Sequence, residues 1–386
     1  MKRSNAIKII AAAFLLAIIA IVVIVIINKN KSHSETEWRL VNNNSIEAEY
    51  NGQFLSYADN KLSFLDYGTM QQSIVCADPT CKHEEKCTAN DKTNHAFIYD
   101  KKIYYFKTTD MYQNGENTII TDIELWNCDL DGSNEKKLTT FEGYDYPTYE
   151  RLLLTDDTAY FFLISTPKSL KQDELKGKAT FFSYELASGK SNNYGDVVSG
   201  FSCDVVVYGI WDNKIIYRTA CLDSDKNATD LLNDFMKENG YKNTDEALEN
   251  FSFEHKTQMY SFDLKTHEIS KYDSMNDIIA IGKSYYLSDT NSKLTITDEK
   301  DNTVTLDSLN NYGNVAALKD EIAVNADGGL YIYSVKEQKL YKSNAAIVYF
   351  VTDKVGEDFI VTHQTDDGSN GIEKLSRDDL ILTEVG

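Results

Sequence analysis

Hydrophobic residues follow two different patterns along the chain, and the first is a single unbroken apolar run at residues 9–27 (IIAAAFLLAIIAIVVIVII) with basic residues on both sides. A helix needs roughly 20 apolar residues to cross a bilayer, so this run predicts a transmembrane anchor. The alternative is a cleaved secretory signal, whose apolar core is about 7–15 residues long and ends at small residues. This run is longer and ends in Ile-Ile-Asn-Lys. We therefore expect an uncleaved single-pass anchor in the cell membrane, with the bulk of the chain extracytoplasmic.

The second pattern fills the rest of the chain, where short apolar runs of β-branched and aromatic residues alternate with clusters of Asn, Asp, Gly, Ser and Lys. With 25 Tyr and 17 Phe but only 3 Pro, this pattern predicts an all-β protein. Small polar pairs such as Asp212-Asn213 and Asp327-Gly328 are typical of tight hairpin turns.

These strands recur as a degenerate repeat of two close apolar strands, a third strand of alternating aromatics and a polar tail. The copies lie at residues 54–76, 97–141, 149–196, 203–273, 277–307, 315–343 and 347–384. Repeats of about 50 residues whose strands cannot bury both faces alone predict a β-propeller. We expect seven blades over residues 37–386, with six or eight as the alternatives, behind an anchor at 1–31 and a linker at 32–36. Residues 37–41 (EWRLV) are expected to add the outer strand of the last blade and close the ring.

One segment breaks the repeat. Residues 227–250 carry Leu231, Leu232, Phe235 and Met236 at helical spacing, and Gly240 follows as a stop signal. The pattern predicts a helical insertion in the fourth blade. It either packs over a propeller face or serves as the feature that binds a partner.

The charge of the tethered part excludes one class of partner. Residues 32–386 carry 34 basic and 60 acidic side chains, a net charge of −26. Phosphate binding depends on neutralising Lys and Arg, so we expect no nucleic acid partner.

A family resemblance appears at residues 124–139 (ELWNCDLDGSNEKKLT), where an aromatic strand is followed by Asp-x-Asp-Gly-x-Asn and Lys-Leu-Thr. This segment resembles the repeat of TolB-like propeller proteins, and the resemblance extends over the architecture of roughly 40–384. It implies binding of a protein or small ligand at the cell envelope without catalysis. The segment Cys-Ala-Asp-Pro-Thr-Cys-Lys-His at 76–83 is similar to stretches in anchored propeller-like envelope proteins of Gram-positive bacteria, a resemblance that implies no particular chemistry.

The segment with the most reactive side chains holds Cys76, Cys81, His83 and Cys87 within twelve residues. Three thiols and an imidazole could supply the four ligands of a tetrahedral zinc site. The spacing is not a common structural zinc pattern, and the short Cys81-x-His83 step would demand unusual ligand geometry. No cofactor is otherwise indicated.

Disulfide bonding is the interpretation that an extracytoplasmic location favours. Cys203 and Cys221 lie equally far from a turn centred on Asp212, so they could face each other across two strands. Cys76, Cys81, Cys87 and Cys128 could then form two further bridges, although six cysteines allow 15 pairings. Unpaired or redox-active thiols are the third alternative.

The sequence contains none of the local catalytic motifs of serine hydrolases, zinc proteases or nucleotide-binding enzymes. His33 lies in the linker, and His95, His255, His267 and His363 are isolated residues that we expect at the surface or in turns. We therefore predict a non-catalytic, membrane-anchored binding or scaffold module for a protein or small envelope ligand. The alternatives are an envelope hydrolase or lyase acting on glycan or peptide at the propeller channel, and metal or redox sensing through residues 76–87.

Overall fold

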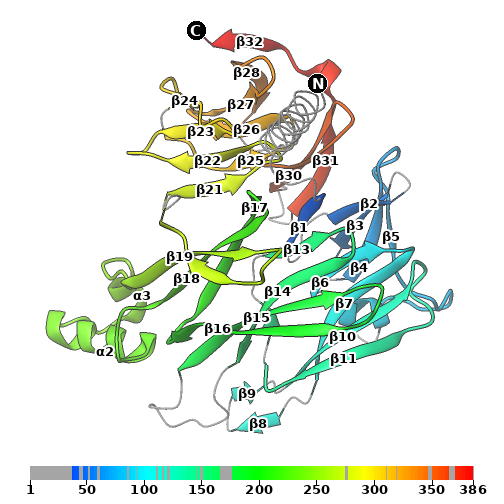
Figure 1. Cartoon of the computed structure of the whole chain (residues 1–386), viewed down its shortest axis with the longest axis vertical. Helices are drawn as coiled ribbons and strands as arrows, with labels where there is room; N and C mark the ends of the chain where they lie inside the picture. The colour runs from blue at the N-terminus through cyan, green and yellow to red at the C-terminus, as the bar shows by residue number, and fades with distance from the viewer. Residues whose placement is uncertain are drawn as a thin grey trace, which may run out of the picture. The chain divides into compact units, whose positions relative to one another are not determined.

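Seven antiparallel sheets of three to six strands, and one separate two-stranded hairpin, make up the computed structural model, which is drawn in Figure 1. The structure describes residues 37–42, 47–50, 53–58, 61–84, 87–92, 94–109, 112–114, 117–119, 122–144, 146–147, 151–165, 176–273, 277–309, 311–318, 320–346, 350–364 and 370–385. The predicted anchor at 9–27 lies outside these residues. Within them, no helix is both long enough and apolar enough to cross a membrane.

Each sheet is one blade built from consecutive strands. The first blade contains β2 (Glu47–Tyr50), β3 (Gln53–Ala58), β4 (Lys61–Asp66) and β5 (Gln72–Ile74). The second contains β6 (Asn94–Tyr99), β7 (Lys102–Thr109), β10 (Asp122–Asp129) and β11 (Lys136–Glu142), with a small hairpin of β8 (Tyr112–Asn114) and β9 (Asn117–Ile119) between β7 and β10. The third contains β13 (Arg151–Thr155), β14 (Thr158–Ser165), β15 (Gly177–Glu185) and β16 (Ser191–Gly200), and the short β12 (Tyr146–Pro147) pairs with β14.

The remaining blades continue this order. The fourth contains β17 (Asp204–Trp211), β18 (Lys214–Leu222), β19 (His255–Asp263) and β20 (Ile269–Lys271). The fifth contains β21 (Ile278–Ile281), β22 (Tyr285–Asp289), β23 (Leu294–Asp298) and β24 (Thr303–Thr305), and the sixth contains β25 (Val315–Ala317), β26 (Glu321–Ala326), β27 (Gly329–Ser334) and β28 (Lys339–Ala346). In the described part of the chain the seventh has three strands, β29 (Phe350–Val355), β30 (Asp358–Gln364) and β31 (Asn370–Leu375). The predicted repeats therefore match the blades in number and order.

Tight turns form where the sequence offers residues that tolerate positive φ. Asp212 and Asn213, which connect β17 to β18, have φ of 50° and 58°. Asp327 and Gly328, which connect β26 to β27, have φ of 45° and 78°. Two consecutive positive-φ residues match the twist of a two-residue hairpin, which explains why these pairs end one strand and begin the next.

The hydrophobic core is divided among the interfaces between blades. Seven clusters of buried residues each join two successive blades, and the seventh joins the last blade to the first. This ring of interfaces is what a closed seven-bladed propeller requires, because each sheet buries its faces on its neighbours. The closing interface is the smallest of those described, with only Leu65 and Ile360 buried in it.

The strand nearest the N-terminus, β1 (Trp38–Asn42), does not lie where the sequence suggested. It pairs antiparallel with β13, from Trp38 opposite Thr155 to Asn42 opposite Arg151, and it also contacts β2, β6 and β17. These are the first strands of four different blades, and most neighbouring first strands contact one another, as β2 contacts β6 and β17 contacts β21. β1 is therefore an extra innermost strand of the third blade, and the prediction of an outer strand on the last blade is wrong.

Side-chain burial explains the position of β1. Val41 is fully buried between the second and third blades, while Trp38 and Leu40 pack between the third and fourth. The indole of Trp38 lies against Gly209, where an added Cβ would approach the ring to 2.3 Å. On an outer edge these apolar side chains would stay partly in water.

The C-terminal strand also departs from the prediction of one blade over 347–384. β32 (Leu382–Val385) pairs with β28 of the sixth blade and not with β31. Neither end of the described chain therefore shares a strand between the first and seventh blades.

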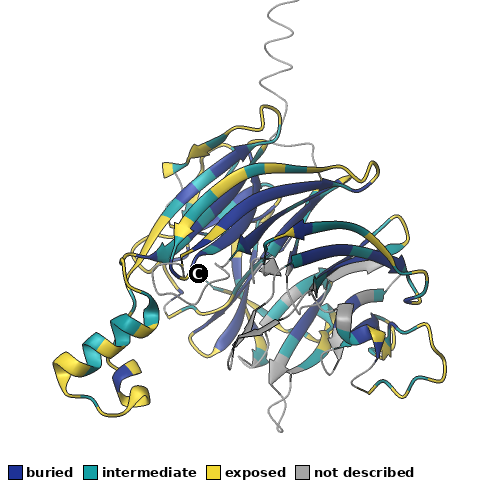
Figure 2. Cartoon of the chain, turned by 90° about the horizontal axis from the view of Figure 1, so that it is seen from below, coloured by how far each residue is buried: buried dark blue, intermediate teal, exposed yellow. Residues whose placement is uncertain are grey.

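Two helices interrupt the fourth blade between β18 and β19, namely α2 (Ala228–Asn239) and α3 (Thr244–Leu248). Asn227 caps α2 by accepting a hydrogen bond from the Asp230 N–H, and Gly240 ends it in the left-handed conformation. No residue of α2 is buried. Figure 2 shows the pair projecting from the sheets, with a mixture of exposed and intermediate residues along α2.

Candidate metal centre

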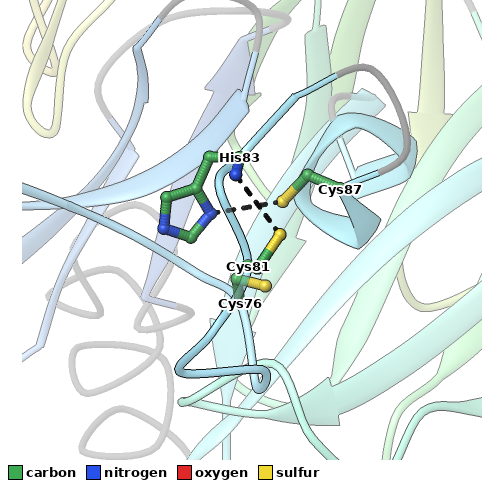
Figure 3. A group of neighbouring side chains, drawn as sticks. All are labelled: Cys76, Cys81, His83 and Cys87. Atoms are coloured by element: carbon green, nitrogen blue, oxygen red, sulfur yellow. Dashed lines mark hydrogen bonds between the residues drawn. The ribbon is translucent and has the colours of Figure 1, made fainter.

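The segment that connects the first blade to the second brings together the four residues in which the sequence suggested a metal site. Cys76 follows β5, the last strand of the first blade, and Cys87 directly precedes η1 (Thr88–Lys92), which leads into β6. One ligand atom from each of Cys76, Cys81, His83 and Cys87 lies within 4.8 Å of every other. Figure 3 shows the sulfur atoms and the imidazole grouped around one point.

Within this cluster, the Cys87 Sγ lies 3.5 Å from the His83 Nδ1. The backbone N–H of His83 donates a hydrogen bond to the Cys81 Sγ at 3.3 Å. This bond fixes the position of the Cys81 sulfur relative to the backbone of His83. His83 has φ of 57°, and this left-handed backbone lets a residue only two positions from Cys81 direct its ring to the same point.

Local hydrogen bonds form the loop on which these side chains lie. The Asp78 carboxylate accepts bonds from the Thr80 N–H and hydroxyl at 2.8 and 2.7 Å. The backbone N–H of Cys81 donates to the Asp78 carbonyl, and that of Cys87 donates to the Glu84 carbonyl. These turns are the local structures that Asp, Thr and Pro-Thr sequences favour, so the loop has defined turns around its cysteines.

The two outer thiols of the loop differ in acidity. Burial raises the pKa of the Cys76 thiol, but hydrogen bonds with the Asp78 backbone, Cys87 and Cys81 outweigh burial and leave this pKa below its ordinary value. Burial and the hydrogen bonds with Cys76 and Cys81 raise the pKa of Cys87. Cys76 is therefore the thiol of this pair that ionises more readily.

The second blade supports the start of the loop through the turn after β10. Gly132 has φ of 84°, and an added Cβ there would lie 3.1 Å from the carbonyl oxygen of Val75, the residue before Cys76. Val75 is itself buried between the first two blades. Gly132 thus packs directly against the base of the cysteine loop, a role that its sequence did not reveal.

The predicted disulfides are not found, because all six cysteines are free thiols. Cys76, Cys81 and Cys87 converge on one another and on His83, whereas Cys128 is buried on β10 between the first two blades. The pairing of Asp204 with Ala220 places Cys203 opposite Cys221, as the sequence predicted. The Cys203 thiol instead donates to the carbonyls of Gly200 and Gly177.

The isolated histidines fall into different environments. His255 is exposed, and His267 stacks on Phe262 with ring centroids 5.7 Å apart. His95 is only 1% exposed, so its expected place at the surface is wrong. His33 and the side chain of His363 lie outside what the structure describes.

A second concave region lies on the third blade, where a cavity of about 270 Å³ is lined by Tyr160, Tyr194 and His267, among others. Its polar atoms bond to one another. The Ser183 hydroxyl pairs with the Tyr194 hydroxyl at 3.0 Å and accepts a bond from Asn192, and Ser188 donates to Glu185. This arrangement forms a polar surface depression.

No family model and no curated protein matches the chain. Solved structures do match in shape. The acylaminoacyl peptidase of Pyrococcus horikoshii is 10% identical with a TM-score of 0.47, over 88% of this chain and 52% of the peptidase. An oligogalacturonate lyase in complex with manganese is 11% identical with a TM-score of 0.47, over 89% of this chain and 94% of the lyase.

The β-propeller domain of the Trilobed protease from Pyrococcus furiosus is 12% identical with a TM-score of 0.43, over 90% of this chain and 96% of that domain. This chain spans about half the length of the acylaminoacyl peptidases that it matches. The seven-bladed fold itself is evident from the seven sheets of this chain and the seven core clusters between them.

Proposed function

We propose that this chain is a membrane-anchored, extracytoplasmic β-propeller that acts as a non-catalytic binding or scaffold module for a protein or small ligand of the cell envelope. The helical insertion of α2 and α3 carries this proposal. Its two helices stand away from the ring, and α2 buries no side chain. Projecting segments on a rigid scaffold are common sites of recognition.

The insertion is ordered by its own contacts. Phe235 stacks on Tyr241 and contacts Phe251, which in turn contacts Phe253 edge-on. Leu248 is 45% exposed at the end of α3. The segment 227–250 carries six acidic and two basic side chains. A preformed surface with aromatic, apolar and acidic groups suits a protein partner that presents apolar and basic residues.

The position of β1 supports a binding role over the alternative of a channel enzyme. β1 contacts the first strands of four blades at the centre of the ring. On the side of the first four blades, the strands that would line a substrate channel therefore pack against a strand of the chain itself.

Removing the insertion tests the proposal. A full-length variant in which a short Gly-Ser linker replaces 227–250 should keep the urea unfolding midpoint of the parent, since Ala247 is the one buried residue of the two helices. A photo-reactive residue at Leu248 should give one discrete adduct in native membranes, and the same residue at Lys300, in a turn of the fifth blade, should not. Loss of folding on deletion, or equal labelling from both positions, would contradict the proposal.

Location is tested separately. A membrane-impermeant protease added to intact cells should digest the propeller while the anchor fragment stays with the membrane. Digestion only after cell lysis would contradict the extracytoplasmic placement.

A further inference from the structure

We propose that Cys76, Cys81, His83 and Cys87 bind one Zn²⁺ ion in a closed tetrahedral site that fixes the connection between the first and second blades. This inference is independent of the proposed binding role. It concerns a connection within the ring, and zinc binding can be tested without any partner protein.

The donor atoms fit zinc in type and spacing. Zinc binds sulfur at about 2.3 Å and imidazole nitrogen at about 2.0–2.1 Å, so tetrahedral donors lie roughly 3.5–3.8 Å apart. The Cys87 Sγ and the His83 Nδ1 already have this separation, at 3.5 Å. All four donor atoms lie within 4.8 Å of one another. Binding therefore requires a contraction of about 1 Å at most among side chains that already face one point.

The backbone positions two of the four ligands. The His83 N–H donates to the Cys81 Sγ, and the positive φ of His83 brings its imidazole to the cluster despite the short Cys81-x-His83 step. On binding, three Cys S–H groups each lose a proton to solvent and form Zn–S bonds, and the neutral His83 forms a Zn–N bond. The product carries a charge of −1, and nothing is oxidised or reduced.

The number of ligands determines what the metal does. Four protein donors fill the tetrahedral shell and leave no position for water or substrate, which is the arrangement of structural zinc sites. The donors span the segment between β5 and η1, so the ion would cross-link the exit of one blade to the entrance of the next. Its binding free energy would then contribute to folding.

The first experiment measures metal in the full-length chain, purified in mild detergent under reducing conditions without chelator. We expect about one zinc per chain by elemental analysis. Titration of the metal-free chain with Co²⁺ should give the visible bands of tetrahedral cobalt and a sulfur-to-cobalt charge-transfer band, both lost on addition of Zn²⁺. A chain that binds neither ion, or whose Cys76, Cys81 and Cys87 are linked by disulfides after isolation without reductant, would overturn the proposal.

Substitutions at the ligands test the assignment. His83→Ala and Cys81→Ser should each weaken Zn²⁺ binding by more than the roughly 10–100-fold that loss of an outer-shell partner causes. Cys221→Ser is the matched control, because Cys221 is a partly exposed thiol outside the cluster, and it should bind zinc like the parent. Ligand variants that retain the affinity of the parent would overturn the proposal. The cobalt spectrum of the unsubstituted chain decides the question even if a variant fails to fold.

Gly132 tests the positioning of the loop from outside the site. Gly132→Ala would push against the Val75 carbonyl and should weaken Co²⁺ affinity by about 10-fold. Gly143→Ala is the control, because Gly143 has a similar φ of 79° in the same blade with nothing within 4 Å of an added Cβ. Equal affinities in the two variants would show that the loop base does not position the ligands.

Discussion

The Tyr67 hydroxyl donates a hydrogen bond of 2.6 Å to the Asp358 Oδ2, joining residues 291 positions apart in the sequence. Tyr67 follows the third strand of the first blade, and Asp358 begins the middle strand of the seventh. The Lys374 ammonium lies 4.8 Å from the centre of the Tyr67 ring. Because no strand is shared across this junction, polar contacts supplement the small apolar cluster that closes the ring.

Tyr67→Phe should therefore destabilise the propeller. Hydrogen bonds to charged groups contribute about 1.5–3 kcal/mol when well buried, and partial exposure of this pair reduces the expected loss to about 1 kcal/mol. Urea unfolding of the full-length chain in detergent measures this loss of unfolding free energy. Tyr341→Phe is the control, because its hydroxyl bonds to Glu337 in an exposed turn within one blade. Equal effects of the two substitutions would show that the Tyr67 bond has no special part in closing the ring.

The same pair predicts a pH dependence. The Tyr67 hydroxyl, with a smaller effect from the Arg377 backbone N–H, lowers the pKa of Asp358 below its ordinary value of 3.8. A lowered carboxyl pKa stabilises the folded state above the unfolded pKa, and this stabilisation is lost as the pH falls through the folded pKa. The stability difference between the parent and Tyr67→Phe should therefore be constant near neutral pH and shrink below about pH 4. A difference that grows in acid would contradict this account.

His95 gives a second acid sensitivity, in a higher pH range. Burial lowers its pKa from 6.5 to about 4, and neither ring nitrogen has a hydrogen-bond partner among the described residues. The unfolded state binds a proton first as the pH falls, so stability should decline between about pH 6.5 and pH 4, by about 3 kcal/mol at the end of that range.

His95→Leu should flatten this slope, whatever its effect on absolute stability. Urea midpoints between pH 7 and pH 4 measure the slope, and His255→Leu, at an exposed histidine, should leave it unchanged. An unaltered slope in His95→Leu would mean that His95 does not titrate in this range.

The effects of substitutions at Trp38 and Gly209 on stability should be coupled. Gly209→Ala would bring a Cβ to 2.3 Å from the indole, and Gly209 also has φ of 142°. We expect a cost well above the roughly 1 kcal/mol of backbone strain alone. Gly195→Ala is the control that measures backbone strain alone, since Gly195 has φ of 95° and nothing lies within 4 Å of an added Cβ. In a Trp38→Ala background the steric part should vanish, giving a coupling energy of about 1–3 kcal/mol in a double-mutant cycle. Additive effects would show that the indole does not occupy this position in solution.

The repeats made the blade number predictable, because each copy carries its own strand alternation and turn residues. The pairing partner of β1 was not predictable in the same way. A five-residue strand such as WRLVN fits any free sheet edge by pattern alone. Its location depends on Gly209, a residue 171 positions after Trp38, and only the folded ring places the two together.

The candidate site was only partly predictable. Residue types identified Cys76, Cys81, His83 and Cys87 as possible ligands. Their convergence depends on the left-handed backbone of His83, and the local sequence His-Glu-Glu does not predict that conformation. The prediction that His95 lies at the surface was wrong because an isolated histidine beside a turn is usually exposed. Its neighbours Ala96, Phe97 and Ile98 are all buried, and this apolar run was the signal that it enters the core.

The central position of β1 has a mechanical consequence. A pull on the chain ahead of Glu37 enters the propeller through β1, whose five residues are paired along their length with β13. Tension directed along that strand loads its hydrogen bonds together in shear, whereas tension on an outer edge strand would open them one after another. The ring thus receives any such force through the third blade.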